Sequence, residues 1–228
     1  MINSLSKLLT ALSGKLTTTS VVLHPSKICP TCGSRLCEAG GRELHPHEPL
    51  DVAAAGSPHP NTNWCCPNPD CPPQVRARLE LWCSPAAMDI KICDAAMVTQ
   101  LVQRGLVRDA AEFYRLRLSE LAALDGMEAA KARVVLDAIA ASRQRDAWRV
   151  LFGLGIPNIG AAEAESLCKH FAALDALFAT GGELLLQMAG VTQVMARSLT
   201  HWLSDPVNRK LIRRLEKAGV NFKTSASR

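Results

Sequence analysis

The chain has 228 residues and a formal net charge of +5 at pH 7, and 48% of its residues are hydrophobic while only 4% are aromatic. This length allows one or two domains with a buried core, and the abundance of Ala and Leu favours helices. Nine cysteines make an odd set, and no export signal or apolar run of membrane-spanning length precedes them, so we expect a cytoplasmic protein rather than a disulfide-rich secreted protein or a membrane protein.

The character of the sequence changes at residue 28. Residues 1–27 are rich in Ser, Thr and Leu without a clear period, and we expect an N-terminal tail. Residues 28–75 hold six of the nine cysteines and nine of the thirteen prolines, which disfavours both a helix and a central strand. A stretch rich in Pro, Gly and His at 41–63 interrupts this segment. We therefore expect a small metal-binding module at 28–75 with a long inserted loop.

Two cysteine pairs in this module have the spacing of metal ligands. Cys29 and Cys32 lie in CPTCG, and Cys66 and Cys71 lie in CPNPDC. Two such turns can supply the four thiolates of a tetrahedral Zn²⁺ site, which would hold the proline-rich chain without a hydrogen-bond ladder. A site with four protein ligands has no open position for a substrate, so the zinc is predicted to be structural rather than catalytic.

Other side chains could compete for the metal. Candidates in the same module are Cys37, Cys65, His45, His47 and His59. For the cysteines outside the two pairs we favour the simpler interpretation that they are small buried or surface residues. These are Cys37, Cys65, Cys83, Cys93 and Cys168.

From residue 76 the sequence predicts short amphipathic helices and almost no strands. One pattern recurs, in which an apolar residue is followed by a turn that usually contains Gly and then by a helix with Ala in its first turns. It is found at 90–102, 124–139, 154–171 and 188–203. The four units make two pairs. We therefore expect a mainly α fold in which these hairpins, at 76–222, follow the zinc module and precede a short tail at 223–228.

These segments resemble a known family. CPTCGSRL and CCPNPDCPPQVRARLELWCSPAAMDI look like the zinc finger of bacterial NAD-dependent DNA ligases. QLVQRGLVRDAAEFYRLRLSELAALDGM, LFGLGIPNIG and DPVNRKLIRRLEKAGV resemble the helix-hairpin-helix domain that follows that finger. The match runs from about Cys29 to Val220. It implies a tandem helix-hairpin-helix domain whose four units bind the sugar-phosphate backbone near a nick.

The catalytic part of that family is not recognised in these residues. The family's adenylation domain attacks NAD with a lysine in a K-x-D-G motif, and no lysine here is followed by x-D-G. A complete OB fold and a BRCT domain are not recognised either. We therefore expect no NAD binding on this chain and favour a non-catalytic module. The alternatives are the DNA-binding half of a split ligase, with a separate catalytic subunit, and a degenerate ligase fragment without activity.

The sequences of the four hairpins predict that some are better suited than others to contact a phosphate. A Gly-apolar-Gly turn exposes the amides at the N-terminus of its second helix to a phosphate oxygen. GIPNIG at 155–160 fits this pattern best, and GVT at 190–192 keeps one glycine. In the first pair Asp94 and Glu128 take the place of the second glycine, where a carboxylate can cap a helix but repels a phosphate. We therefore expect the second pair to bind DNA and the first pair to act mostly as scaffold.

The candidate DNA-binding residues come from these turns and from the basic C-terminal region. From Arg197 to Arg228 there are eight Lys or Arg residues and two acidic residues. The predicted contacts are Gly155, Asn158, Ile159, Gly160, Ala161, Gly190, Thr192, Arg209, Lys210, Arg213 and Arg214. Because phosphate contacts carry no base information, we expect sequence-independent binding of double-stranded DNA. The ligase resemblance implies that this DNA is nicked and that binding serves repair or replication at the nucleoid.

Overall fold

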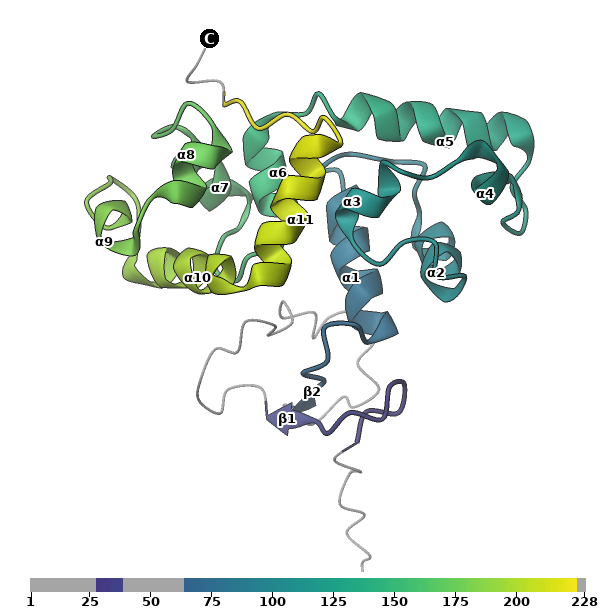
Figure 1. Ribbon diagram of the computed structural model, residues 1–228, viewed down its shortest axis with the longest axis horizontal. Helices are drawn as coiled ribbons and strands as arrows, with labels where there is room; N and C mark the ends of the chain where they lie inside the picture. Colours follow the sequence, from purple (N-terminus) through teal and green to yellow (C-terminus); the bar gives the residue numbers. More distant parts are fainter. Residues whose placement is uncertain (1–27, 39–63, 225–228) are drawn as a thin grey trace, which may run out of the picture.

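The computed structural model describes residues 28–38 and 64–224 (Figure 1). The predicted tail at 1–27, the predicted loop at 41–63 and the candidate ligands His45, His47 and His59 lie outside the described residues. In the described part a small cysteine-rich knuckle is followed by a helical domain, which confirms the predicted mainly α fold.

The knuckle contains two short strands, β1 (Cys37–Glu38) and β2 (Trp64–Cys65), which pair antiparallel. The helical domain then contains α1 (Pro72–Cys83), α2 (Ala95–Gln103), α3 (Ala110–Phe113), α4 (Leu118–Ala122), α5 (Ala129–Ser142), α6 (Ala147–Gly153), α7 (Ala161–Cys168), α8 (Leu174–Ala179), α9 (Gly182–Leu185), α10 (Gln193–Ser204) and α11 (Pro206–Lys217). No helix in the described ranges is long and apolar enough to cross a membrane.

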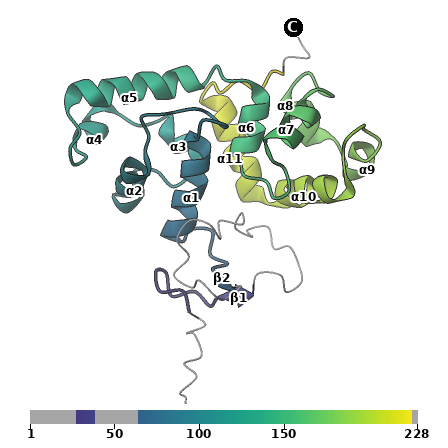
Figure 2. The ribbon, with the colours of Figure 1, turned by 180° about the vertical axis from the view of Figure 1, so that it is seen from behind.

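The helices form two successive sets of five, α1–α5 and α6–α10, followed by α11. In the first set α1 packs on α2 and α4 packs on α5, and in the second set α6 packs on α7 and α9 packs on α10. Seen from both sides, α2–α5 and α7–α10 lie at opposite ends of the domain, with α1, α6 and α11 between them (Figures 1 and 2). The domain is thus an internal duplication, and each set contains two helical hairpins.

Backbone geometry supports the duplication. Gly126 and Gly190 have positive φ and lie two residues before the N-caps of α5 and α10, while Gly155 has positive φ and lies five residues before the N-cap of α7. In the first hairpin Asp89, with φ of 53°, lies five residues before Asp94, the N-cap of α2. The turn that has lost its glycine therefore keeps the left-handed residue, which the sequence pattern did not reveal.

Asp89, in this uncommon conformation, forms an ion pair with a residue far along the chain. Arg145, just before α6, donates to the Asp89 carboxylate at 2.7 Å, and the side chain of Asp89 is only 15% exposed. The Asp89 amide donates to the carbonyl of Ser84 at 2.9 Å. These contacts join the first hairpin to the start of the second set of helices, so the strained turn also serves as a link between the two halves.

The apolar core divides between knuckle and helices. Cys29, Leu36, Cys66 and Cys71 form one small buried cluster, and the large core of the helical domain is separate from it. Helix α1 belongs to the large core through Val75 and residues beyond it. The predicted boundary at residue 75 thus falls inside α1, because the same helix begins at the last cysteine of the knuckle.

Candidate metal centre and nucleic-acid interface

The first half of the knuckle is a tight turn around Cys29 and Cys32. The Cys29 amide donates to the carbonyl of Ser34 at 2.7 Å, and the amide of Gly33 donates back to the Cys29 carbonyl at 2.9 Å. Gly33 has a φ of +72°, a value that glycine adopts without strain. The turn therefore directs two thiol groups to one side of the chain.

The second half is a turn that leads directly into a helix. The amide of Cys71 donates to the carbonyl of Asn68 at 3.1 Å, and Cys71 is the N-cap of α1 with Pro72 next to it. Arg78, on α1, donates to the carbonyl of Pro69 at 2.7 Å. Proline is well suited to the first position of a helix, so the proline-rich sequence is compatible with a fixed helix start beside the cysteines.

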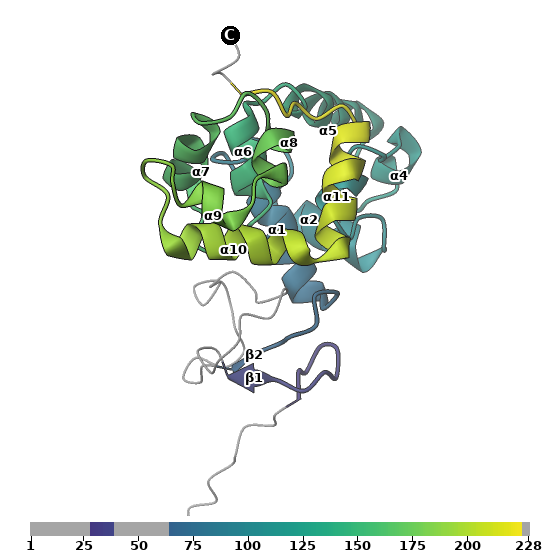
Figure 3. The same cartoon turned by 60° about the vertical axis from the view of Figure 1, so that its left-hand side comes forward.

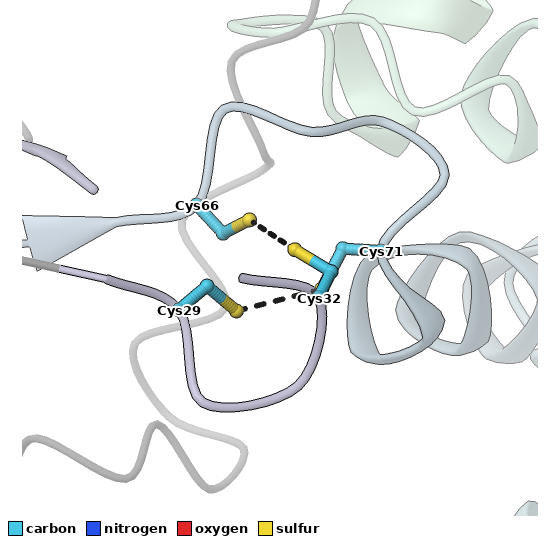
Figure 4. A group of neighbouring side chains, drawn as sticks. All are labelled: Cys29, Cys32, Cys66 and Cys71. Atoms are coloured by element: carbon cyan, nitrogen blue, oxygen red, sulfur yellow. Dashed lines mark hydrogen bonds between the residues drawn. The ribbon is translucent and has the colours of Figure 1, made fainter. Parts of the chain in front are cut away.

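The pairing of β1 with β2 brings the two turns together (Figure 4). The sulfur atoms of Cys29, Cys32, Cys66 and Cys71 all lie within 4.8 Å of one another. The Sγ atoms of Cys29 and Cys71 are 3.7 Å apart, and those of Cys32 and Cys66 are 3.5 Å apart. A tetrahedron of sulfurs around Zn²⁺ has edges of about 3.8 Å. The four predicted ligands therefore fit a single four-coordinate metal ion.

The pKa values of three of these thiols are shifted, and in different directions. Burial raises the pKa of Cys66 to about 11 and also raises the pKa of Cys71. Hydrogen bonding with Ser34 lowers the pKa of Cys32 to about 6. Four neighbouring thiolates would repel one another, and a bound divalent cation compensates this repulsion and the loss of hydration. The cluster is thus suited to a metal ion.

The remaining described cysteines lie outside this cluster. Cys37 and Cys65 face each other in the β1–β2 pair. Cys83, Cys93 and Cys168 are buried in the helical domain, where burial raises the pKa of Cys168 to about 12. The prediction that these five are not ligands of the same ion agrees with the composition of the cluster among the described residues.

The hairpin between α6 and α7 is the strongest candidate phosphate site. Gly155 has a φ of +67° and Asn158 a φ of +60°, so the chain turns sharply before α7. Gly160 is the N-cap of α7, and it has no side chain that could accept a hydrogen bond from the first amides of the helix. The first amides of a helix have no intrahelical acceptor, so those that begin at Ala161 are free to bind an anion.

Two residues of this hairpin make contacts inside the helical domain. The Asn158 amide group donates to Ser198 of α10 at 2.9 Å, and Ile159 is only 4% exposed. Asn158 therefore ties the hairpin to the neighbouring helix, and Ile159 anchors it in the core. Both residues position the turn, and the hydrogen-bond donors that remain for a phosphate are backbone amides.

An acidic side chain that the hairpin pattern does not reveal lies close to this turn. A Cβ atom at Gly160 would lie 2.6 Å from a carboxylate oxygen of Glu163, in the first turn of α7. Glycine at this position thus makes room for the Glu163 side chain. The best hairpin therefore also has a carboxylate near its amides, although that side chain can swing away more easily than a residue at the N-cap itself.

The hairpin between α9 and α10 has the second candidate site. Thr192 is the N-cap of α10, and its hydroxyl oxygen accepts a hydrogen bond from the Met195 amide at 3.2 Å. Gly190, with a φ of +80°, packs close to Ser166 of α7. The ring of His170 contacts the carbonyl of Ala189 at 3.0 Å. The second pair of hairpins is therefore joined through α7.

The first pair of hairpins differs at its helix starts. The Asp94 carboxylate accepts from the Met97 amide at 2.8 Å, which caps α2. Glu128 is the N-cap of α5 but makes no capping hydrogen bond with its side chain. Glu128 thus places a negative charge at a helix start without the structural benefit of a cap.

Helix α11, which follows α10 in Figure 3, carries several basic residues in different surroundings. Lys210, Arg213 and Lys217 are exposed, and their spacing of three and four residues places them on one face of the helix. Arg209 donates to the carbonyls of Leu203 and Ser204 at 2.8 Å each and so closes the end of α10.

Arg214 lies on another side of α11. It forms ion pairs with Asp109 and with Glu112, the latter at 3.3 Å, and its side chain is only 27% exposed. Arg214 is therefore a structural link between α11 and α3, and two carboxylates already engage its guanidinium group. Lys217, three residues further along α11, is exposed.

Comparison with known proteins finds the helix-hairpin-helix motif and a similarity to DNA ligases. A family model described as "Helix-hairpin-helix motif" matches residues 149–212. A DNA ligase of Synechococcus sp. (strain JA-3-3Ab) is 34% identical over 192 residues, which are 84% of this chain and 26% of the ligase. DNA ligases of Rubrobacter xylanophilus and Chlorobaculum tepidum are each 35% identical, over 194 and 203 residues, covering 85% and 89% of this chain and 26% and 27% of the ligases.

The described part of the chain is thus a mainly α domain with a helix-hairpin-helix motif at 149–212 and a four-cysteine knuckle at the start of its first helix. Over most of its length the chain is similar to part of these DNA ligases, and the resemblance predicted from its motifs is confirmed. It spans about a quarter of the length of the curated relatives it matches.

Proposed function

We propose that these residues form a ligase-related DNA-binding module that contacts the phosphates of duplex DNA independently of base sequence. The second pair of hairpins and the exposed basic face of α11 make the contacts. The knuckle, held by Zn²⁺ on Cys29, Cys32, Cys66 and Cys71, is a structural element beside them.

The main observation behind the proposal is the turn at 155–160. Its N-cap is Gly160, which has no side chain to occupy the amides of α7, and the helix dipole adds attraction for an anion. The helix-hairpin-helix match at 149–212 covers this turn, the one at 190–192 and most of α11. It does not extend to the first pair of hairpins, where Asp94 and Glu128 stand at the helix starts.

Catalysis is not part of the proposed role. These 228 residues contain no K-x-D-G sequence, so a lysine that attacks NAD in the manner implied for the ligase family would have to come from other residues. Backbone amides and the side chains of Lys and Arg can bind the phosphates of a duplex, but in that role they supply no nucleophile for adenylation. We therefore assign binding, and not adenylation, to this part of the molecule.

The salt dependence of binding tests the role of α11. Charge reversal of an exposed phosphate ligand, Arg213→Glu, should weaken duplex binding and lower the slope of log K against log salt by about 0.9 for each lost phosphate contact. Fluorescence anisotropy with a labelled duplex at several salt concentrations measures both quantities.

Arg133→Glu is the matched control, because Arg133 is exposed on α5, in the first set of helices. It makes the same change in net charge, so a general field effect would appear in both variants. If Arg133→Glu changes the slope as much as Arg213→Glu does, the assignment of the contact to α11 is wrong.

A further inference from the structure

Two cysteines outside the metal cluster lie opposite each other across the knuckle. Cys37 of β1 and Cys65 of β2 are direct partners in the antiparallel register. Their Sγ atoms are 3.0 Å apart, and the Cys37 thiol also contacts the carbonyl oxygen of Cys65 at 3.4 Å. The sequence did not predict this pair, because 28 positions separate the two residues and only the strand register brings them together.

The pair is distinct from the metal cluster. Successive side chains of an extended chain point to opposite sides, so Cys65 points away from the side to which Cys66 contributes its sulfur. The cluster within residues 28–38 and 64–224 consists of Cys29, Cys32, Cys66 and Cys71. Cys37 and Cys65 are both partly exposed, whereas three of the four cluster cysteines are buried. Small reagents can therefore reach this pair more easily than the cluster.

The backbone geometry permits a covalent link. Directly opposed residues of an antiparallel pair have Cα atoms about 4.5–5.5 Å apart, and disulfides span about 4.4–6.8 Å between Cα atoms. Closing the bond therefore requires rotation of side chains and no rearrangement of the strands. We propose that Cys37 and Cys65 form a reversible cross-strand disulfide when the protein meets a low-molecular-weight disulfide, while the metal cluster stays intact.

The reaction is a two-step thiol–disulfide exchange. The sulfur of one cysteine attacks a sulfur of the small disulfide and expels one small thiol, which leaves a mixed disulfide on the protein. The second cysteine attacks the protein sulfur of that mixed disulfide and expels the second small thiol. The two protein thiols lose two electrons and two protons, which reduce the small disulfide to two thiols.

The disulfide would give the knuckle a second cross-link in addition to the metal ion. The bond joins the segment that carries Cys29 and Cys32 to the segment that carries Cys66 and Cys71, which the metal also joins. The oxidised protein would therefore keep its two halves connected after the metal is removed. The reduced protein would depend on the metal alone.

The test uses the purified, zinc-loaded full chain and oxidised glutathione. Intact-mass spectrometry should show a loss of two hydrogen atoms, peptide mapping should show Cys37 linked to Cys65, and zinc should stay bound. The Cys37→Ser variant should load the same zinc and stop at a glutathione adduct on Cys65. Failure to form the link, a link that involves a cluster cysteine with release of zinc, or the same mass loss in Cys37→Ser would each overturn the proposal.

Discussion

Replacing Cys66 by alanine should abolish metal binding and unfold the knuckle while the helical domain stays folded. The four sulfurs lie within 4.8 Å of one another, and the apolar cluster around them contains little besides the ligands and Leu36. Structural zinc contributes on the order of 10 kcal/mol to the folding of small zinc peptides. Among the described residues of the knuckle, this small core offers no comparable source of stability, so we expect loss of one ligand to unfold it.

Unfolding should stop near Cys71. From Val75 onward α1 belongs to the core of the helical domain, and Leu79 and Trp82 are fully buried there. Elemental analysis should find one zinc per wild-type chain and a large loss in the variant, and limited proteolysis should cut the variant only before α1. Cys37→Ala is the matched control, because Cys37 lies in the same knuckle outside the cluster. A Cys66→Ala protein that keeps one zinc would contradict the assignment.

The Gly160→Glu substitution should weaken duplex binding by about 1–3 kcal/mol, or roughly 5- to 150-fold. The new carboxylate would stand at the N-cap of α7, beside the amides proposed to hold a phosphate, and it would join the carboxylate of Glu163. The repulsion concerns the DNA backbone, so the loss should be alike for duplexes of different sequence. Anisotropy titrations with two unrelated duplexes measure it.

Two further variants separate the effect of the added Cβ atom at Gly160 from the effect of negative charge at a helix start. Gly160→Ala adds a Cβ whose close neighbour is the movable end of Glu163, so its effect should be small compared with that of Gly160→Glu. Glu128→Gly removes a carboxylate that makes no cap, so it should tighten binding at little cost to α5. Should Gly160→Glu leave the affinity unchanged while Glu128→Gly lowers it, the first pair of hairpins and not the second binds DNA.

The local features of this protein could be predicted from its sequence. Turn residues identify each half of the cluster, Cys29 with Cys32 and Cys66 with Cys71, because the spacing within each pair is local and its turn has a fixed chemistry. The hairpins can be predicted for the same reason, since Gly and a following helix with Ala near its start form a short local pattern.

Features that depend on distant contacts could not be predicted. Arg214 looks like its neighbour Arg213 in the sequence, and only the packing of α11 on α3 reveals the acidic partners of Arg214. Asp89 adopts a positive φ that is uncommon for a non-glycine residue, and its ion pair partner is 56 positions away. The orientation of Glu163 over Gly160 depends on a side-chain conformation, which a residue pattern does not specify.

The most direct test of the account is a salt titration of the unmodified chain with nicked and intact duplexes of two unrelated sequences. We expect the affinities for the two sequences to agree and log K to fall linearly with log salt, by about 0.9 for each phosphate contacted. A clear preference for one base sequence, an affinity that does not change with salt, or no binding at low salt would contradict the proposal that this module binds DNA through its phosphates.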